Sequence, residues 1–108
     1  MIIKTNFAKL FGADAITIFP FIFTSMPDNF CLIAHETVHY KEQKKCLVIP
    51  WWIAYLIWPS FRLQAEIRAY KVQIACGGIT VEQAGIYLSQ KYMLNISFYE
   101  SCLLLKNQ

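Results

Sequence analysis

Two histidines, His35 and His39, stand four residues apart and are the only histidines in the chain. Glu36 directly follows the first, so the segment reads His-Glu-Thr-Val-His. Side chains four residues apart project from the same face of a helix on successive turns. Both imidazoles can therefore reach a common point only if this segment is helical, and the H-E-x-x-H spacing is the one in which two such rings bind a single zinc ion.

The residues around this motif predict a long amphipathic helix. Ser25, Pro27 and Asp28 offer a cap, a proline suited to a first turn, and an acid at the positive end of the helix dipole. We expect the helix to follow them and to continue to about Cys46. In projection, one sector holds the motif and its neighbours, and the opposite sector holds Thr37 and the lysines. The inward sector contains Leu32, His35, Glu36, His39, Gln43 and Cys46.

The rest of the chain predicts one strand and several further helices. Residues 15–24 are rich in β-branched and aromatic side chains, which favours an edge strand or a strand bent at Pro20. Residues 51–57 lie between two prolines and predict a short helix. Gly77 ends a periodic segment over residues 61–76, and Thr80 with Gln83 resembles a capping box. We expect the last two helices to span about residues 80–92 and 95–105.

Length and composition favour one compact domain over residues 1–108. Hydrophobic residues make up 56% of the chain and charged residues 16%, which is the reverse of a disordered composition. The net charge of +3 comes from scattered basic residues, so we expect no nucleic-acid partner. We predict an α+β fold that is predominantly α. The oligomeric state does not follow from the sequence.

The cysteines and the N-terminus suggest a reducing compartment. The four cysteines lie far apart with no Cys-x-x-Cys pair, so we expect reduced thiols. Asp14 interrupts what would be the apolar core of a signal peptide, and we expect a cytoplasmic protein. The uncharged segment 47–58 is too short to span a bilayer. We expect a buried core helix there; the alternative is an interfacial segment in peripheral contact with a membrane.

A third ligand is needed if one zinc position is to stay open for water. Glu66 is the candidate, because it stands in the middle of an apolar stripe, where a carboxylate needs a cation. The alternative to a metal is an ion pair with Arg62, and Glu42 is the second choice of ligand. The alternative for the two histidines is a pair of core imidazoles, each satisfied by a carbonyl group or a side chain.

Two segments of the chain resemble a known family. Its segments AHETVHYKEQ and AEIRAY, separated by a tryptophan-rich stretch, resemble the gluzincin class of zinc metallopeptidases. The likeness is to the very small H-E-x-x-H proteins of bacteria and their phages, and it covers residues 29–70. The resemblance implies that His35, His39 and Glu66 bind Zn²⁺ and that Glu36 is the catalytic base.

The chain departs from that pattern in two ways. It is shorter than full-length gluzincins, and it has no further histidine to stabilise an oxyanion. Tyr70 is the candidate for that role; the alternative is that Tyr70, one turn from Glu66, buttresses the ligand.

We therefore expect a zinc-dependent hydrolase that cleaves a peptide bond in a peptide or protein substrate. The strand before the motif would bind the extended peptide along its free edge. The alternatives are a non-catalytic interaction module that zinc holds together, and a membrane-surface protein in which the motif is accidental.

Overall fold

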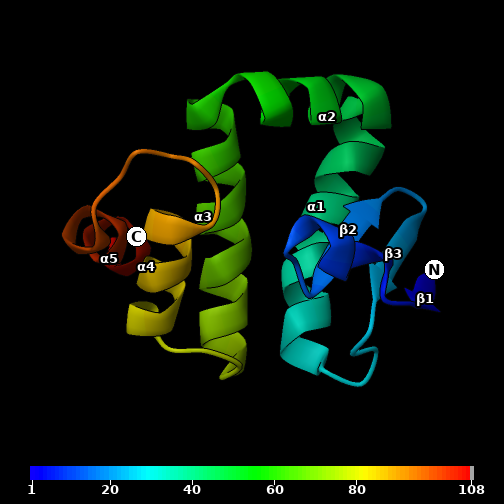
Figure 1. Ribbon diagram of the computed structural model, residues 1–108, viewed down its shortest axis with the longest axis horizontal. Helices are drawn as coiled ribbons and strands as arrows, with labels where there is room; N and C mark the ends of the chain where they lie inside the picture. Colours follow the sequence, from blue (N-terminus) through cyan, green and yellow to red (C-terminus); the bar gives the residue numbers. More distant parts are fainter. Residues whose placement is uncertain (108) are drawn as a thin grey trace.

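The protein is predominantly helical, with a small sheet packed against one of its helices (Figure 1). The computed structural model describes residues 1–107. This arrangement confirms the predicted α+β class. The elements, in chain order, are β1 (Ile2–Lys4), η1 (Phe7–Phe11, a 3-10 helix), β2 (Ala15–Ile18), β3 (Phe21–Thr24), α1 (Phe30–Cys46), α2 (Val48–Ile57), α3 (Pro59–Cys76), α4 (Val81–Gln90) and α5 (Phe98–Lys106).

The sheet has the strand order β1-β3-β2, with β1 parallel and β2 antiparallel to β3. The prediction of a single strand over residues 15–24 is therefore wrong, because this segment forms two strands. Phe19 and Pro20 form a turn that divides the segment into a hairpin, in which Ile18 pairs with Phe21. Pro20 lies outside both strands, as its missing N–H requires. The edge position that the sequence predicted is occupied by β2.

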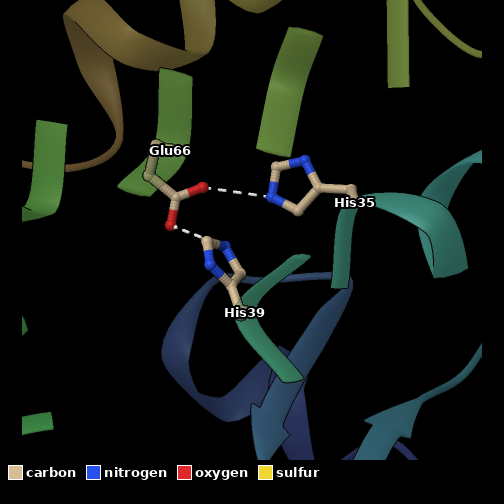
Figure 2. A group of neighbouring side chains, drawn as sticks. All are labelled: His35, His39 and Glu66. Carbon is tan, nitrogen blue, oxygen red and sulfur yellow. Dashed lines mark hydrogen bonds and ion pairs between the residues drawn. The ribbon is translucent and has the colours of Figure 1, made fainter. Parts of the chain in front are cut away.

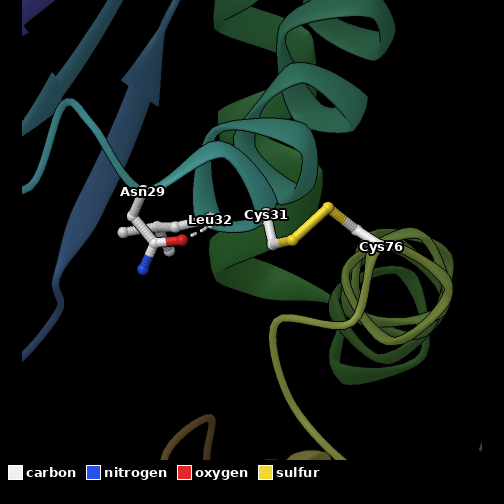
Figure 3. The surroundings of a disulfide bond; sticks show 4 residues. All are labelled: Asn29, Cys31, Leu32 and Cys76. Atoms are coloured by element: carbon white, nitrogen blue, oxygen red, sulfur yellow. Dashed lines mark hydrogen bonds between the residues drawn. A yellow bond between two sulfur atoms is a disulfide. The ribbon is translucent and has the colours of Figure 1, made fainter.

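Helix α1 ends at Cys46 as expected, but Asn29 caps its start. The Asn29 side chain accepts a hydrogen bond of 3.1 Å from the Leu32 N–H (Figure 3). Ser25, Pro27 and Asp28 therefore lie in the connecting segment and do not take part in the cap. An asparagine side chain satisfies one of the free N–H groups of the first turn, as the expected serine cap would have done.

The later helices lie close to their predicted positions, but α2 is not the buried core helix expected there, because Trp51 is its one buried residue. Helix α2 begins at Val48, three residues early, because Pro50 is tolerated within a first turn. Gly77 ends α3 with a φ of 89°, and the Thr80–Gln83 capping box opens α4. Helix α4 stops at Gln90 and α5 starts at the Ser97 cap, so the connecting loop is longer than expected.

Helices α1 and α3 lie side by side and are joined at both ends. Helix α2 crosses one end (Figure 1), and a disulfide between Cys31 and Cys76 closes the other (Figure 3). The expectation of four reduced thiols is therefore wrong for this pair, while Cys46 and Cys102 are free. Gly78 packs so closely that a Cβ there would lie 2.3 Å from the Cys31 Cβ, and this contact requires glycine.

The main apolar core lies between α3, α4 and α5, away from the sheet. Its buried members are Ile67, Tyr70, Ala84, Leu88 and Leu105. Over residues 1–107, each helix is too short or too polar to cross a membrane. The facing sides of α1 and α3, between α2 and the disulfide, are not part of this core. Their buried side chains are largely polar.

Candidate metal centre

The buried face of α1 carries polar side chains. His35, Glu36, His39 and Gln43 are the buried residues of this helix. They belong to the inward sector predicted from the helical projection, so the prediction is confirmed for these four residues. Leu32 is only partly buried, and the prediction is wrong for Cys46, which is exposed. Because polar groups lose hydration when buried, each of them needs a partner on the elements packed against α1.

Glu66, from the neighbouring α3, supplies that partner for both imidazoles (Figure 2). Its carboxylate oxygens lie 3.0 Å from His35 Nε2 and 3.2 Å from His39 Nε2. One ligand atom from each of the three residues lies within 4.8 Å of the others. A tetrahedral ion with bonds of about 2.1 Å holds its ligands about 3.4 Å apart, so the cluster is close to the size of such a site. His35, His39 and Glu66 form a buried group that could bind a metal ion.

The unpartnered polar atoms of the cluster fit a cation. His35 Nδ1 and both nitrogens of His39 are buried and make no hydrogen bond of good geometry within the part of the chain that the structure describes, although His39 Nε2 lies 3.2 Å from Glu66 and His39 Nδ1 lies 3.6 Å from Glu42. Buried polar groups are rarely left in this state unless an ion or water completes them. Two imidazoles and one carboxylate are also the donor types found in zinc sites.

The electrostatics of the cluster point the same way. Burial disfavours the charged imidazolium of His39, but Glu66 and the acids Glu42 and Glu36 outweigh it and raise its pKa to about 10. Burial likewise opposes ionisation of Glu66, yet the two imidazoles lower its pKa well below the usual range. The pocket therefore holds a carboxylate together with positive charge, and a divalent cation would satisfy the same field.

Arg62 and Glu42, which the sequence offered as an ion-pair partner of Glu66 and as another metal ligand, make other contacts. Arg62 does not pair with Glu66; its guanidinium donates to the backbone carbonyls of Tyr55, Leu56, Tyr92 and Met93. Glu42, the second choice of ligand, accepts hydrogen bonds from Arg68 Nε at 2.6 Å and Trp51 Nε1 at 3.2 Å. Its Oε1 lies 3.6 Å from His39 Nδ1, so Glu42 stands behind the ring, outside the ligand group.

Tyr55 is a site residue that the sequence analysis missed. Its hydroxyl donates a 2.6 Å hydrogen bond to Glu66 Oε2. Burial and the nearby Glu66 charge raise the pKa of this phenol far above its usual value, so it remains a donor. A tyrosine within the tryptophan-rich segment was the only available signal, and its meaning depends on α2 crossing over α3.

Tyr70 lies beside the cluster but its hydroxyl is already paired. The ring centroid is 4.4 Å from that of His35, and the hydroxyl lies 2.6 Å from the Tyr92 hydroxyl. Burial, with the charge of Glu66, raises the pKa of Tyr70 above its ordinary value. The side chain therefore packs against a ligand ring and remains protonated.

Glu36 lies next to the ligand atoms and is held by the sheet. One carboxylate oxygen lies 3.7 Å from His35 Nε2, and the other accepts a 2.9 Å hydrogen bond from the hydroxyl of Thr17 on β2. Gln43, two turns further along α1, binds the same strand through the Thr17 carbonyl and the Phe19 N–H, both at 2.8 Å. The edge strand thus orients the glutamate of the motif.

A large cavity opens over the cluster. Its volume is about 920 Å³, within the range of ligand-binding clefts. Polar groups of the site lie among aromatic and aliphatic side chains contributed by η1, β2, α1, α2, α3 and α4. The lining side chains include Thr17, Glu36, Trp51, Tyr55, Tyr70 and Tyr92.

Comparisons with protein-family models, curated proteins and solved structures find no match for this chain.

Proposed function

We propose that the protein is a zinc-dependent hydrolase, most simply a small peptidase, with its active site at His35, His39 and Glu66. One observation carries the proposal: a buried cluster of three ligand side chains has the Glu36 carboxylate beside it and a large cavity in front of it. Three protein ligands leave one position of a tetrahedral ion for water, as in catalytic sites.

Zinc is the ion that the ligands favour. Two imidazole nitrogens and one carboxylate oxygen match catalytic zinc centres, whereas Mg²⁺ and Ca²⁺ prefer all-oxygen sites. The same donor set with more open positions binds Fe²⁺ in oxygenases, and the carboxylate of Glu36 beside the site favours hydrolysis over that chemistry. When bound, zinc would supply Lewis acidity for a carbonyl and lower the pKa of a water molecule.

The chain's own residues would then perform the proton transfers. Glu36 accepts a proton as the water attacks the amide carbonyl, and it passes that proton to the departing amine. Thr17 keeps the carboxylate oriented through its hydrogen bond. Tyr55 holds Glu66 in position from the opposite side of the cluster.

A peptide substrate would lie in the cavity along β2, the edge strand of the sheet. Unpaired backbone groups on an edge strand bind an extended chain by continuing the sheet. Gln43 already occupies the Thr17 carbonyl and the Phe19 N–H, so pairing would be confined to the part of β2 that begins at Ala15.

The first test is elemental analysis of the purified protein together with peptide hydrolysis. We expect about one zinc per chain, and we expect His39→Ala to lose it. Glu36→Gln should retain zinc and reduce turnover of a fluorogenic peptide library at least about a hundredfold, the usual contribution of a general base. Glu82→Gln, the same change at an exposed site on α4, is the matched control.

Two results would contradict the proposal. Unchanged turnover in Glu36→Gln would remove that residue from the reaction. Zinc binding without hydrolysis of any peptide would favour the alternative of a non-catalytic interaction module, against which the three-ligand cluster argues, because structural zinc sites are closed by four ligands.

A further inference from the structure

Helix α2 has two opposed faces. Trp51 and Tyr55 stack at 4.9 Å and line the cavity. The opposite face carries Ile49, Ile53 and Ile57, which are spaced four residues apart and are 72%, 48% and 62% exposed. One face of this helix is therefore aromatic and the opposite face carries isoleucines, so that neither face is polar.

The exposed face is part of a larger apolar surface, here named the α2 surface. It comprises Leu47, Ile49, Ile53, Ile57 and Trp58, together with Leu56, which also lines the cavity. The chain has no charged residue from Leu47 to Phe61. Contiguous apolar surface of this kind on a small protein marks an interaction site. Figure 1 shows α2 as the bar across one end of the molecule, where a flat partner can reach it.

Basic side chains stand beside the α2 surface. Lys44 and Lys45 are exposed in the last turn of α1, with Cys46 between them and Leu47, and Lys41 is exposed one turn earlier. The one acid between residues 37 and 65 is Glu42, which is paired with Arg68. The field beside the apolar face is therefore positive.

We propose that the α2 surface docks the protein on a membrane that carries anionic lipids. An apolar helix face flanked by lysines is the pattern of helices that lie in the plane of the interface. Trp58 stands at one end of α2, and tryptophan is favoured at headgroup depth. A second copy fits less well, because two lysine-flanked faces would repel. This proposal does not depend on zinc or on hydrolysis.

Vesicle sedimentation tests the proposal directly. The full chain should bind phosphatidylcholine vesicles that contain phosphatidylserine, and binding should weaken as salt is added. The triple variant Ile49→Ser, Ile53→Ser and Ile57→Ser should bind at least about tenfold more weakly, because it removes apolar area from the interface. Since these side chains are exposed, the variant should keep its helical circular dichroism.

The charge component has its own variant. Lys44→Ala with Lys45→Ala should weaken binding to the anionic vesicles by roughly ten- to thirtyfold and leave any binding to pure phosphatidylcholine unchanged. Brominated lipids should quench tryptophan emission in the wild-type protein and not in the isoleucine variant.

The matched control replaces three exposed apolar side chains elsewhere, Leu10→Ser, Phe30→Ser and Leu103→Ser, which are 80%, 86% and 44% exposed. Equal weakening in this control would overturn the proposal, as would absence of binding to anionic vesicles at low salt. A dimer in sedimentation velocity that the isoleucine variant abolishes, without vesicle binding, would assign the surface to self-association instead.

Discussion

At the scale of single residues, Tyr55 links α2 to the candidate metal centre. Tyr55→Phe removes only the hydroxyl that donates to Glu66 Oε2. Partners of this kind orient metal ligands, and their loss usually costs ten- to a hundredfold in affinity. We expect zinc affinity, measured by competition with a chromophoric chelator, to fall by about tenfold or more.

The control for this change is Tyr99→Phe, which removes a hydroxyl from a tyrosine that is 71% exposed on α5. An affinity equal to that of the wild type in Tyr55→Phe would mean that Glu66 needs no support from α2.

Thr17 is a positioning residue for the proposed base. Thr17→Val keeps the shape of the side chain but removes the donor that holds the Glu36 carboxylate. If Glu36 acts as proposed, turnover should fall by roughly tenfold or more, because proton transfer depends on the geometry of the carboxylate. Zinc affinity should stay unchanged.

The conservative variant Thr17→Ser restores the hydroxyl and should restore turnover. A variant that loses zinc and turnover together would indicate that Thr17 supports the fold of the cluster as a whole.

The residues of the cluster differ in how far the sequence could identify them. His35 and His39 follow from spacing alone, since a helical segment fixes their relation. Glu66 follows from its position in an apolar stripe, although the choice between a metal and Arg62 needed the tertiary structure. Tyr55 and Thr17 reach the site from elements whose placement depends on long-range packing, and no local pattern marks them.

At the scale of elements, the disulfide holds α1 and α3 together at the end opposite α2. Cys31→Ser frees a loop whose ends are 45 residues apart in the sequence. Chain entropy makes such a cross-link worth about 4 kcal/mol, which corresponds to a fall of roughly 15–20 °C in Tm. Thermal unfolding followed by circular dichroism measures this change.

Cys102→Ser is the control, since it removes a thiol that is not cross-linked. If Cys31→Ser and the wild type melt at the same temperature, the bond does not constrain the unfolded chain.

Helices and their caps were predictable because their signals are local. The Thr80–Gln83 box and the Gly77 terminus act within one turn, and both stand where the sequence placed them. The strand β1 has only three residues and pairs with β3 across a large loop, so its sequence alone carries no signal. The Cys31–Cys76 bond is equally non-local, because nothing in the spacing of the cysteines shows which helices lie together.

At the scale of the whole molecule, the metal group joins the two halves of the fold. His35 and His39 come from α1, which carries the sheet, and Glu66 comes from α3, which carries the apolar core. An ion held by both should stabilise the folded state. At a free zinc concentration about a thousandfold above Kd, the gain should be about 4 kcal/mol.

Differential scanning calorimetry with and without a chelator measures this effect, and we expect zinc removal to lower Tm by roughly 15–20 °C. His39→Ala should melt at one temperature under both conditions. If the Tm of the wild type is the same with and without zinc, the group does not bind this ion in the folded protein.

The double attachment of α1 to α3 also determines what happens when the backbone is cut. Cys31 and Cys76 enclose the whole of α2, whose outer face is apolar and exposed. A protease that nicks the chain anywhere between these cysteines leaves two fragments in one covalent molecule. The nicked protein keeps its full mass on a non-reducing gel and separates only when a thiol reagent is added.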